Sequence, residues 1–381
     1  MKICKHFSEC GGCRSQDIPY QEQLGLKEAR VKDLMGTLGI ESELKPINYS
    51  DEWFYRNKME FSFADQGGVV CGLYSKKEKR KVVDLEECFI FSADTPIILK
   101  AIKDFLKTKN HSVYNKYSHE GFLRNLIIRE TKFTNQIMVG IVTSSSEAFD
   151  QKLFVESLTD LKLQSPIKSI YRIVNDSLSD AVIFEQKELL YGEPFIEERL
   201  DSLTFKIAID TFFQVNPRMV VGFYNKIKNY LNLSDSQSVL DLFCGVGSIG
   251  IFLASSAKFV WGVELSKDIV DMAWQNAKAN KIENVSFIAS DTRKFLNTQG
   301  SFYKGIDAIV VNPPRCGLSN KIIRAILRLE PKIIVYSSCN SQALFRDLGG
   351  LIEQYSLDFI EPFDFFPHTP HLEALSILRR K

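Results

Sequence analysis

The sequence has no long apolar run. None of its apolar stretches reaches the roughly 18 to 20 residues needed to span a bilayer. The N-terminal MKICKHFSEC has no apolar segment of the kind found in secretory signals. Low-complexity stretches and internal repeats are also missing, which excludes collagen, coiled-coil and disordered chains. With 45% hydrophobic and 25% charged residues in 381, the sequence predicts a cytoplasmic globular protein of two or three domains.

An excess of one charge sign is missing too. The chain has 48 Lys and Arg against 47 Asp and Glu, a net charge of +1. This excludes a uniformly cationic surface, but a nucleic-acid partner can still be recognised by a local patch. Two basic clusters are present, Lys76–Lys81 and Arg379–Lys381. Each is also typical of a solvated loop or tail, so charge alone leaves the partner open.

The second half of the sequence alternates short apolar runs with helical patterns. Such repeated strand–helix units predict a parallel, doubly wound α/β sheet. The last two apolar runs have no helix between them, which favours a terminal antiparallel hairpin on the sheet edge. The expected strands are Val239–Phe243, Phe259–Val263, Val285–Ala289, Ala308–Val311, Ile333–Tyr336, Leu357–Pro362 and Glu373–Leu378.

The first half is less regular. Short alternating runs such as Met59–Phe63 and Leu126–Glu130 are interrupted by helical patterns, including Gln21–Leu38 and Pro96–Lys107. This mixture predicts an α+β domain containing an antiparallel sheet. We therefore expect two domains, 1–205 and 206–381, with the boundary between Leu200 and Phe212.

A glycine-rich loop follows the first strand of the second half. Gly245, Gly247 and Gly250 match G-x-G-x-x-G, and the next strand ends at Glu264, where a carboxylate could accept ribose hydroxyls. A dinucleotide and S-adenosylmethionine both fit this pattern. Asp241, just ahead of the glycines, would repel a pyrophosphate and could meet a positively charged ligand. It favours the methyl donor.

Two further strand ends carry reactive residue types. Asn312-Pro313-Pro314-Arg315 follows one strand, and Cys339 follows the next, just before a helix. At a helix N-terminus the dipole would lower the pKa of the thiol, so Cys339 is a candidate nucleophile. An inert buried cysteine is the alternative.

The segment Phe363–Glu373 supplies candidate bases. Glu373 begins an apolar strand, and a carboxyl at such a boundary is expected to have a raised pKa that suits proton abstraction. His368 and His371 compete for the same role.

Four cysteines form a candidate metal site. Cys4, Cys10 and Cys13 crowd together near the N-terminus, and Cys88 lies far downstream. Structural zinc and iron–sulfur clusters both use four thiolates. Three clustered ligands plus a distant one favour the cluster, while zinc stays open.

Together these segments resemble the S-adenosylmethionine-dependent RNA uracil-C5 methyltransferase family. The motifs are Phe212–Pro217, Asp241–Gly250, Asn312–Arg315, Ser338–Asn340 and His371–Glu373. The spellings Asn-Pro-Pro-Arg and Tyr-Ser-Ser-Cys-Asn, and a chain that begins at the cysteines without a preceding TRAM domain, look most like the branch that modifies bacterial 23S ribosomal RNA. Transfer RNA is the alternative substrate. More distant alternatives are an amino-methyltransferase and a catalytically idle RNA-binding iron–sulfur protein.

The resemblance implies roles for individual residues. Cys339 matches the nucleophile that adds to uracil C6, and Glu373 matches the base that removes the C5 proton. The four cysteines match the ligands of a 4Fe–4S cluster. Asn312 departs from the Asp of many relatives. The residues that match the donor site are Gln214, Phe243, Gly245, Ser248, Glu264, Asp291 and Asn312.

The same resemblance implies how RNA is engaged. A uracil in folded RNA must be turned outward, and Phe212, Phe365 or Phe366 could stack on it or on its neighbours, although core packing is the usual role of a phenylalanine. The Lys76–Lys81 run is then expected to contact phosphates. We expect the protein to act as a monomer with no membrane partner.

Overall fold

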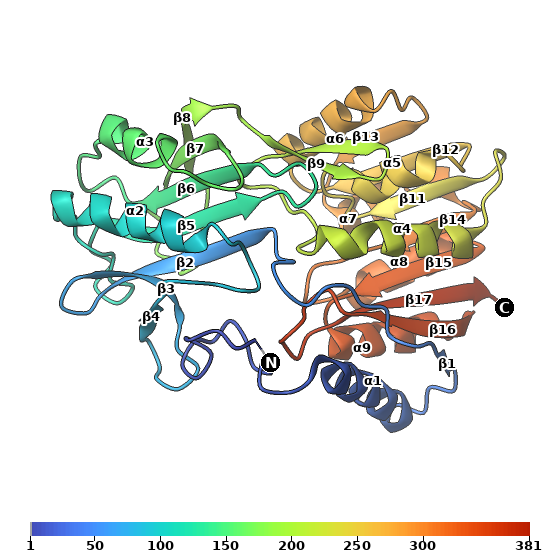
Figure 1. Cartoon of the computed structure of the whole chain (residues 1–381). Coiled ribbons are helices and arrows are strands. Elements are labelled where there is room, and N and C mark those ends of the chain that lie inside the picture. Colours follow the sequence, from blue (N-terminus) through green and yellow to red (C-terminus); the bar gives the residue numbers. More distant parts are fainter. Residues whose placement is uncertain (1) are drawn as a thin grey trace.

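The computed structural model describes residues 2–381, which build two large mixed sheets (Figure 1). One sheet, called the second sheet because most of its strands come from the second half of the chain, has eight strands in the order β1-β16-β17-β15-β14-β11-β12-β13. Five neighbouring strands of this sheet are parallel, and β17 runs against them. The strands are β1 (Glu43–Leu44), β11 (Ser238–Leu242), β12 (Phe259–Glu264), β13 (Val285–Ala289), β14 (Ala308–Val311), β15 (Ile333–Ser338), β16 (Tyr355–Phe363) and β17 (Glu373–Arg380).

Helices cover both faces of this sheet, which confirms the doubly wound α/β prediction. Two separate apolar cores lie on its two sides, because the central strands are buried on both faces. β14, for example, is buried at every position. The helices are α4 (Pro217–Leu231), α5 (Ser248–Ala254), α6 (Lys267–Ala279), α7 (Thr292–Thr298), α8 (Asn320–Leu329) and α9 (Ser341–Leu351), with a short 3₁₀ helix η1 (Gly300–Tyr303).

The terminal hairpin is present, but it does not lie at the sheet edge. β17 inserts between β15 and β16, and β1 from the N-terminal part of the chain pairs in parallel with β16. The prediction of an edge position was wrong because a two-residue strand such as β1 leaves no periodic signal in the sequence.

The first large sheet has the order β4-β3-β2-β5-β6-β7-β8. Its prediction as antiparallel was wrong for one pair, since β6 and β7 are parallel and are joined through helix α3 (Gln151–Thr159). Together with α3, helix α2 (Thr95–Lys109) packs on this sheet. The strands are β2 (Lys58–Asp65), β3 (Val69–Tyr74), β4 (Val82–Asp84), β5 (Leu123–Glu130), β6 (Ile137–Thr143), β7 (Ile167–Val174) and β8 (Gln186–Gly192).

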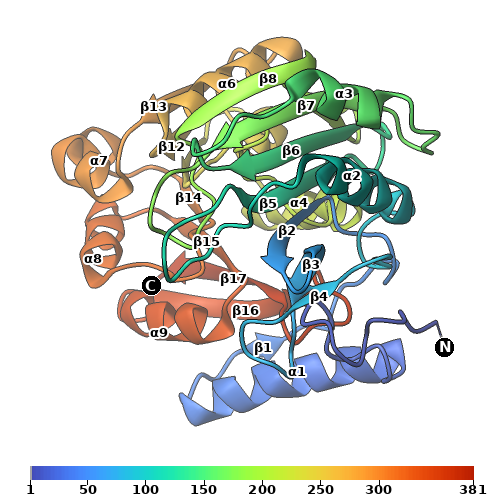
Figure 2. The same cartoon turned by 90° about the vertical axis from the view of Figure 1, so that its left-hand side faces the viewer.

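Two further segments pack against helices of the second sheet. The hairpin of β9 (Ile196–Leu200) and β10 (Leu203–Ile207) packs against α6, and helix α1 (Tyr20–Thr37) packs against α9 of the second sheet (Figure 2). The expected boundary at residue 205 falls inside β10. The division into 1–205 and 206–381 stays a proposal, to which we add that residues 20–48 belong with the second sheet.

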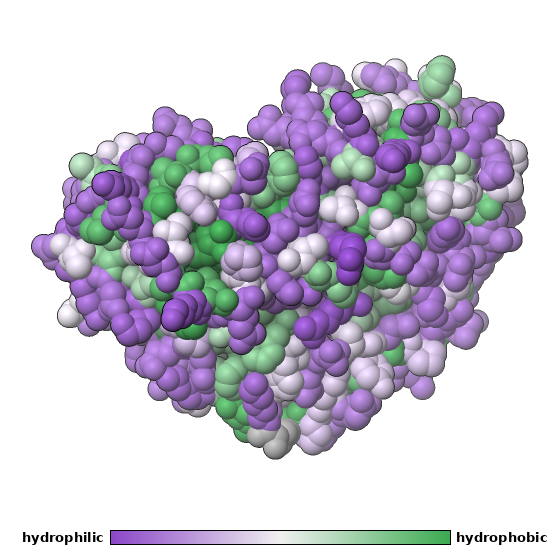
Figure 3. Space-filling view, turned by 45° about the horizontal axis from the view of Figure 1, so that its top comes forward, coloured by the Kyte–Doolittle hydropathy of each residue, from purple (hydrophilic) through white to green (hydrophobic). Residues whose placement is uncertain are grey.

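The surface reflects this two-part arrangement. Two lobes meet at a notch, and hydrophilic residues cover most of both lobes (Figure 3). Across residues 2–381, no helix has the length and apolar character that a membrane crossing requires.

Candidate active site

The carboxyl ends of the parallel strands form one edge of the second sheet. Leu242 lies beside Val263 and Val311, and Val311 lies beside Tyr336, so the loops that follow these strands emerge together. β17 begins at this edge and runs away from it toward the C-terminus, at the right of Figure 1. The edge therefore faces the first sheet. In doubly wound folds it is where ligands bind.

The same strand register brings the two predicted catalytic residues together. Ser338 at the end of β15 lies opposite Ala374 of β17. Continuing this antiparallel register by one residue places Cys339 opposite Glu373. Neighbouring residues in such a pair have Cβ atoms about 4.5–5.5 Å apart. The sequence distance between the two motifs is thus closed by strand pairing.

The glycine loop turns sharply between β11 and α5. Gly247 has φ +78°, and a Cβ there would come within 2.6 Å of the Phe287 ring. A glycine is therefore required both for the backbone conformation and for the close approach to β13. Phe243 also adopts a left-handed φ of 63°, which is uncommon outside glycine. Its half-buried side chain lies at the predicted donor edge.

Asp241 lies behind this loop and is fully buried. It therefore cannot contact a ligand directly, contrary to the prediction. Its Oδ2 accepts the Gly250 N–H at 3.1 Å, while Oδ1 has no partner within residues 2–381. Burial raises its pKa to about 8. The carboxyl holds the start of α5 against β11 and leaves one oxygen unsatisfied beneath the glycine loop.

Glu264 lies at the end of β12, beside the glycine loop. Its Oε2 accepts the Gly245 N–H at 3.2 Å, and Oε1 accepts the N–H of Leu265 at 2.7 Å. These bonds fix the orientation of the carboxylate. A carboxylate oxygen has two lone pairs, so Oε2 can still accept from a ligand hydroxyl.

Of the remaining predicted donor residues, Ser248, Asn312 and Asp291 lie in segments that follow strands of this sheet, whereas Gln214 lies between β10 and α4. Ser248 opens α5 and shares a 2.7 Å hydrogen bond with Tyr224 OH. Gln214 is buried, and its carbonyl accepts from the Asn57 side chain at 2.8 Å. Asn312 directly follows β14 and is half-buried. Asp291 is exposed and caps α7 by accepting the Lys294 N–H at 2.8 Å.

Cys339 lies between β15 and α9, as predicted, but the expectation of a lowered thiol pKa was wrong. Burial, together with the charge of Glu373, raises the pKa of Cys339 to about 11, and the nearby Arg315 only partly offsets this. Desolvation outweighs the helix dipole because the thiol is half-buried beside a carboxyl. Cys339 therefore holds its proton at neutral pH in the structure as it stands.

Glu373 matches its expected character. The side chain is 3% exposed, and burial raises its pKa to about 8. Within residues 2–381 its Oε1 has no hydrogen-bond partner. A buried carboxyl that lacks an ion pair and has a raised pKa is suited to proton transfer.

The loop before Glu373 is held by residues that sequence reasoning missed. Lys27 of α1 forms a buried ion pair with Asp364, at 2.6 Å from Nζ to Oδ1. Tyr20 OH donates to the other oxygen of Asp364 at 3.0 Å, and Tyr55 OH donates to the Pro367 carbonyl at 3.2 Å. We call residues 364–371 the base loop. The buried face of α1 includes the polar residues Gln23 and Lys27, so apolar periodicity gave no signal for this contact.

The geometry favours Glu373 over His368 and His371 as the candidate base. His368 is buried, stacks on Trp53 with a 4.0 Å centroid distance, and its pKa is lowered to about 4 by burial. His371 is exposed and contacts Arg315 at 3.2 Å. Of the aromatic candidates, Phe365 is fully buried and therefore packs in the core, whereas Phe212 is 59% exposed.

The four predicted metal cysteines line one small cavity. Cys4, Cys13 and Cys88 are buried, and Cys10 is half-buried. Over residues 2–381, no group of three or more His, Cys, Asp and Glu side chains is gathered closely enough to hold a single metal ion. Zinc thiolates at bonds of about 2.3 Å would require such close gathering.

The cysteine loop, residues 4–13, also contacts the base loop. Arg14, the next residue, donates its N–H to the His368 carbonyl at 2.8 Å. On its other side, Cys10 pairs with Ser75 in an isolated antiparallel bridge. The loop thus lies between the β3–β4 hairpin and the segment that leads to Glu373.

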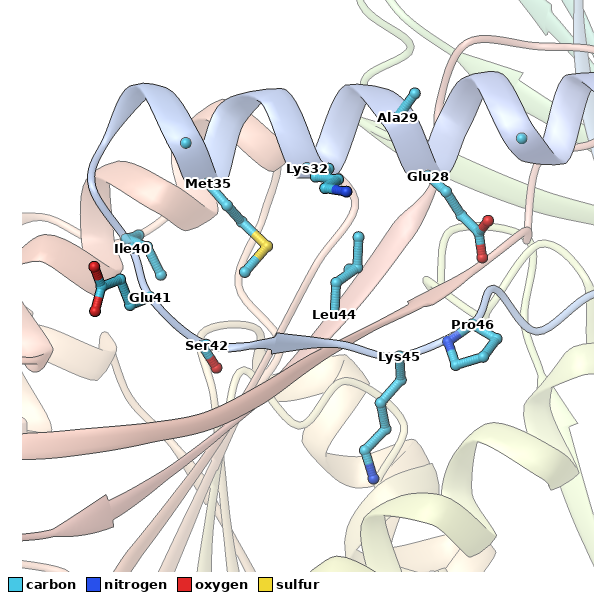
Figure 4. Close-up of a pocket in the computed structure, with 12 residues that line it drawn as sticks. Glu28, Ala29, Lys32, Met35, Ile40, Glu41, Ser42, Leu44, Lys45 and Pro46 are labelled. Carbon is cyan, nitrogen blue, oxygen red and sulfur yellow. The ribbon is translucent and has the colours of Figure 1, made fainter.

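A separate groove lies between α1 and β1, away from this edge. It has a volume of about 810 Å³, and Met35 and Leu44 point into it while Glu28 lies at one end (Figure 4). The Glu28 carboxylate accepts the Ile47 N–H at 2.6 Å, so it fastens the chain after β1. None of the predicted site residues lines this groove.

Comparison with protein families shows to which family the chain belongs. The model of the tRNA (uracil-5-)-methyltransferase family matches residues 19–381. The chain belongs to this family. An uncharacterized RNA methyltransferase of Clostridium tetani is 35% identical over 384 residues, covering 99% of this chain and 84% of that protein. One from Staphylococcus aureus strain MSSA476 is 32% identical over 383 residues, with the same coverage.

A solved structure supports the same assignment. The Pyrococcus abyssi tRNA (uracil-54, C5)-methyltransferase, in complex with S-adenosyl-L-homocysteine, aligns with a TM-score of 0.77 and 31% identity. The alignment covers 97% of this chain and 86% of that one. The predictions of an RNA uracil-C5 methyltransferase family and of its α/β methyltransferase fold are therefore confirmed. The ribosomal branch stays a prediction.

Proposed function

We propose that this protein methylates C5 of a uridine in folded RNA through a covalent adduct between Cys339 and uracil C6. The observation that carries the proposal is the register of β15 and β17, which sets Cys339 and Glu373 opposite each other at the carboxyl edge of the sheet. The nucleophile and the base must reach adjacent carbons of one ring, so they have to lie side by side.

Each residue has one task in this reaction. Cys339 Sγ, once deprotonated, adds to C6 and makes C5 nucleophilic. After C5 has gained its methyl group, Glu373 takes the C5 proton, and the electrons released form the C5–C6 double bond as the sulfur–C6 bond breaks. Uracil regains its aromatic character, and the Cys339 thiolate is free again.

The donor edge is proposed to bind S-adenosylmethionine, which supplies an electrophilic methyl group on a positively charged sulfonium. The relative from Pyrococcus abyssi holds the demethylated product of this compound. The residues proposed to line the site are Gln214, Phe243, Gly245, Ser248, Glu264, Asp291 and Asn312. Glu264 has a free lone pair for ribose hydroxyls, and Asn312 can accept a hydrogen bond without adding charge. A positive charge nearby would also lower the pKa values of Cys339 and Glu373.

The adduct provides the test. RNA containing 5-fluorouridine cannot lose its C5 substituent as a proton, so it should trap the protein as a covalent, methylated complex. We expect a mass shift located on a Cys339 peptide and no complex with the Cys339→Ala protein. Cys316→Ala is the matched control, because Cys316 is an exposed cysteine in a neighbouring loop and should still form the complex. Methylation of ordinary RNA without any trapped complex would refute the covalent route.

For the RNA, we propose a uridine of 23S ribosomal RNA. The Asn-Pro-Pro-Arg and Tyr-Ser-Ser-Cys-Asn spellings support it. A transfer-RNA uridine is the second candidate, because the solved relative is described as a tRNA methyltransferase. Deleting the gene and measuring 5-methyluridine by mass spectrometry in separated ribosomal and transfer RNA decides between them. Loss from transfer RNA alone would refute the first choice. We also propose that a monomer acts, which light scattering checks.

We further propose that Cys4, Cys10, Cys13 and Cys88 hold a 4Fe–4S cluster. Their shared cavity supports it. Bound there, the cluster would join the cysteine loop to Cys88, which precedes α2. Anaerobically purified protein should contain about four irons and absorb visible light near 400 nm. Zinc in a colourless protein would refute the proposal.

A further inference from the structure

A cationic and aromatic surface lies on the first sheet, outside the catalytic edge. It consists of the segment Tyr74–Lys81, which ends β3 and forms the tip of the β3–β4 hairpin, and the turn Tyr114–Glu120 before β5. We call it the hairpin patch. Two exposed rings belong to it: Tyr117 is 57% exposed and Tyr74 is 47% exposed.

The cations of the hairpin patch are largely uncompensated. Lys81 pairs with Glu78, and Lys116 pairs with Asp180. In the part of the chain that the structure describes, the other four cations of the patch have no carboxylate within salt-bridge distance; they are Lys76, Lys77, Lys79 and Arg80. Even with Glu120 of the turn counted, the cationic side chains outnumber the acidic ones. The protein as a whole has a net charge of only +1, so this is a local concentration of positive charge.

The rings are held in place by these cations. The Arg80 guanidinium lies 4.4 Å from the centroid of the Tyr117 ring, and Lys116 Nζ lies 5.4 Å from that of Tyr74. Both rings remain about half exposed beside these cations. The patch therefore offers flat aromatic faces within a field that attracts anions.

Hydrogen bonds between residues close in sequence also fix the two loops. Ser75 Oγ accepts the N–H groups of Lys77 and Glu78, both at 3.1 Å, and Asn115 Oδ1 accepts the Tyr117 N–H at 2.9 Å. A surface that is ordered before binding loses less entropy when a ligand arrives.

The patch connects physically to the catalytic edge. Lys76 donates its N–H to the Glu9 carbonyl, and Gly11 donates to the Tyr74 carbonyl, both at 2.9 Å. The cysteine loop that makes these contacts also bonds to the base loop through Arg14. One continuous set of contacts thus runs from the hairpin patch to the segment before Glu373.

We propose that the hairpin patch binds an unpaired segment of the substrate RNA that flanks the target uridine. Tyr117 and Tyr74 stack on bases, while Lys77, Lys79 and Arg80 contact phosphates. This inference rests on the proposed function, since it takes RNA as the substrate. Base stacking on aromatic rings combined with backbone phosphate contacts is the chemistry of single-stranded nucleic-acid recognition. An acidic peptide would use the charges but not the exposed rings.

The test compares full-length variants in binding to a fluorescent single-stranded RNA oligonucleotide. Tyr117→Ala should weaken binding roughly 5- to 100-fold, and Tyr117→Phe should restore it, because only the ring face is needed. Lys77→Gln with Lys79→Gln should reduce the slope of log affinity against log salt by about 0.7 for each charge removed. Phe302→Ala is the matched control, since Phe302 is 81% exposed and distant in the fold on η1.

Kinetics separate this inference from the proposed function. In the patch variants, KM for RNA should rise by the same factor by which RNA binding weakens. The kcat and the binding of S-adenosylhomocysteine should stay unchanged. Unchanged KM and unchanged binding in Tyr117→Ala, with normal methylation by the wild type, would overturn the patch alone. No methylation of any RNA by the wild type would overturn the proposed function instead. Equal binding of polyglutamate and RNA, insensitive to Tyr117→Ala, would also refute an RNA site.

Discussion

Two buried carboxyls in the same region of the chain are treated in opposite ways. Asp364 in the base loop is fully buried and is neutralised by Lys27 and Tyr20. Glu373, at the catalytic edge, is 3% exposed but has no ion pair with any residue from 2 to 381, and burial raises its pKa to about 8. The paired carboxyl fixes a loop, while the unpaired one is left able to exchange a proton. Burial alone does not distinguish structure from chemistry; the partner does.

The largest effect should come from removing the unpaired carboxyl. Glu373→Gln keeps the shape but cannot accept a proton, so turnover should fall about 10²- to 10⁴-fold. The covalent complex with ordinary RNA should now accumulate, because its breakdown needs the base. Gel-shift of denatured protein–RNA mixtures measures this. Unchanged turnover would remove Glu373 from the reaction.

The same variant should be more stable than the wild type at alkaline pH. An unfolded Glu ionises near 4.5, whereas folded Glu373 holds its proton to about 8. Between these two pH values Glu373 is protonated in the folded state and ionised in the unfolded state. The free energy of unfolding of the wild type therefore falls as pH rises through this range. Gln does not ionise, so the Glu373→Gln protein does not lose stability in this way. Thermal unfolding at pH 6 and 9 should show the variant gaining relative to the wild type at pH 9.

Removing the partner of the paired carboxyl should instead destabilise the protein. Lys27→Met leaves Asp364 buried without its cation, which costs about 3–5 kcal/mol of unfolding free energy. Urea unfolding measures it. Lys332→Met is the control, because it breaks the more exposed Lys332–Asp307 pair and should cost at most about 1 kcal/mol. Equal losses in both variants would mean that the buried pair has no special role in holding the base loop.

A smaller effect concerns the nucleophile. Burial and the charge of Glu373 raise the pKa of Cys339 to about 11, and Arg315 opposes this. Adduct formation with 5-fluorouridine RNA should therefore accelerate with pH, up to about tenfold per unit from 7 to 9. Arg315→Gln should slow it roughly tenfold at pH 8, since one pKa unit is a factor of ten. A plateau below pH 8 would show a thiol that is already ionised.

The sequence located the catalytic edge because its motifs follow strands. Cys339, Asn312 and Glu264 each stand directly after an apolar run, and parallel strands bring such positions to one edge. The sequence did not show the environment of Cys339, because its pKa is raised first by burial and then by the carboxyl of Glu373, and both depend on long-range packing.

The supports of the site could not be predicted for a similar reason. Lys27 and Asp364 are 337 positions apart. Asp364 lies in the segment Phe363–Glu373, but nothing in the local sequence names Lys27 as its partner. In the first sheet, β8 was missed because all but one of its residues are exposed, so it lacks the alternation that marks a half-buried strand. Long-range pairing, and not local preference, decides these features.

The pairing of β1 with β16 has a consequence for biosynthesis. β1 leaves the ribosome early, whereas β16 and β17 emerge last, so the outer strand waits for its neighbour through almost the whole of translation. Contacts this distant in sequence fold slowly, and until they form β16 has an open edge that can recruit other chains. A fragment cut to hold only residues 206–381 would keep that open edge permanently and should aggregate.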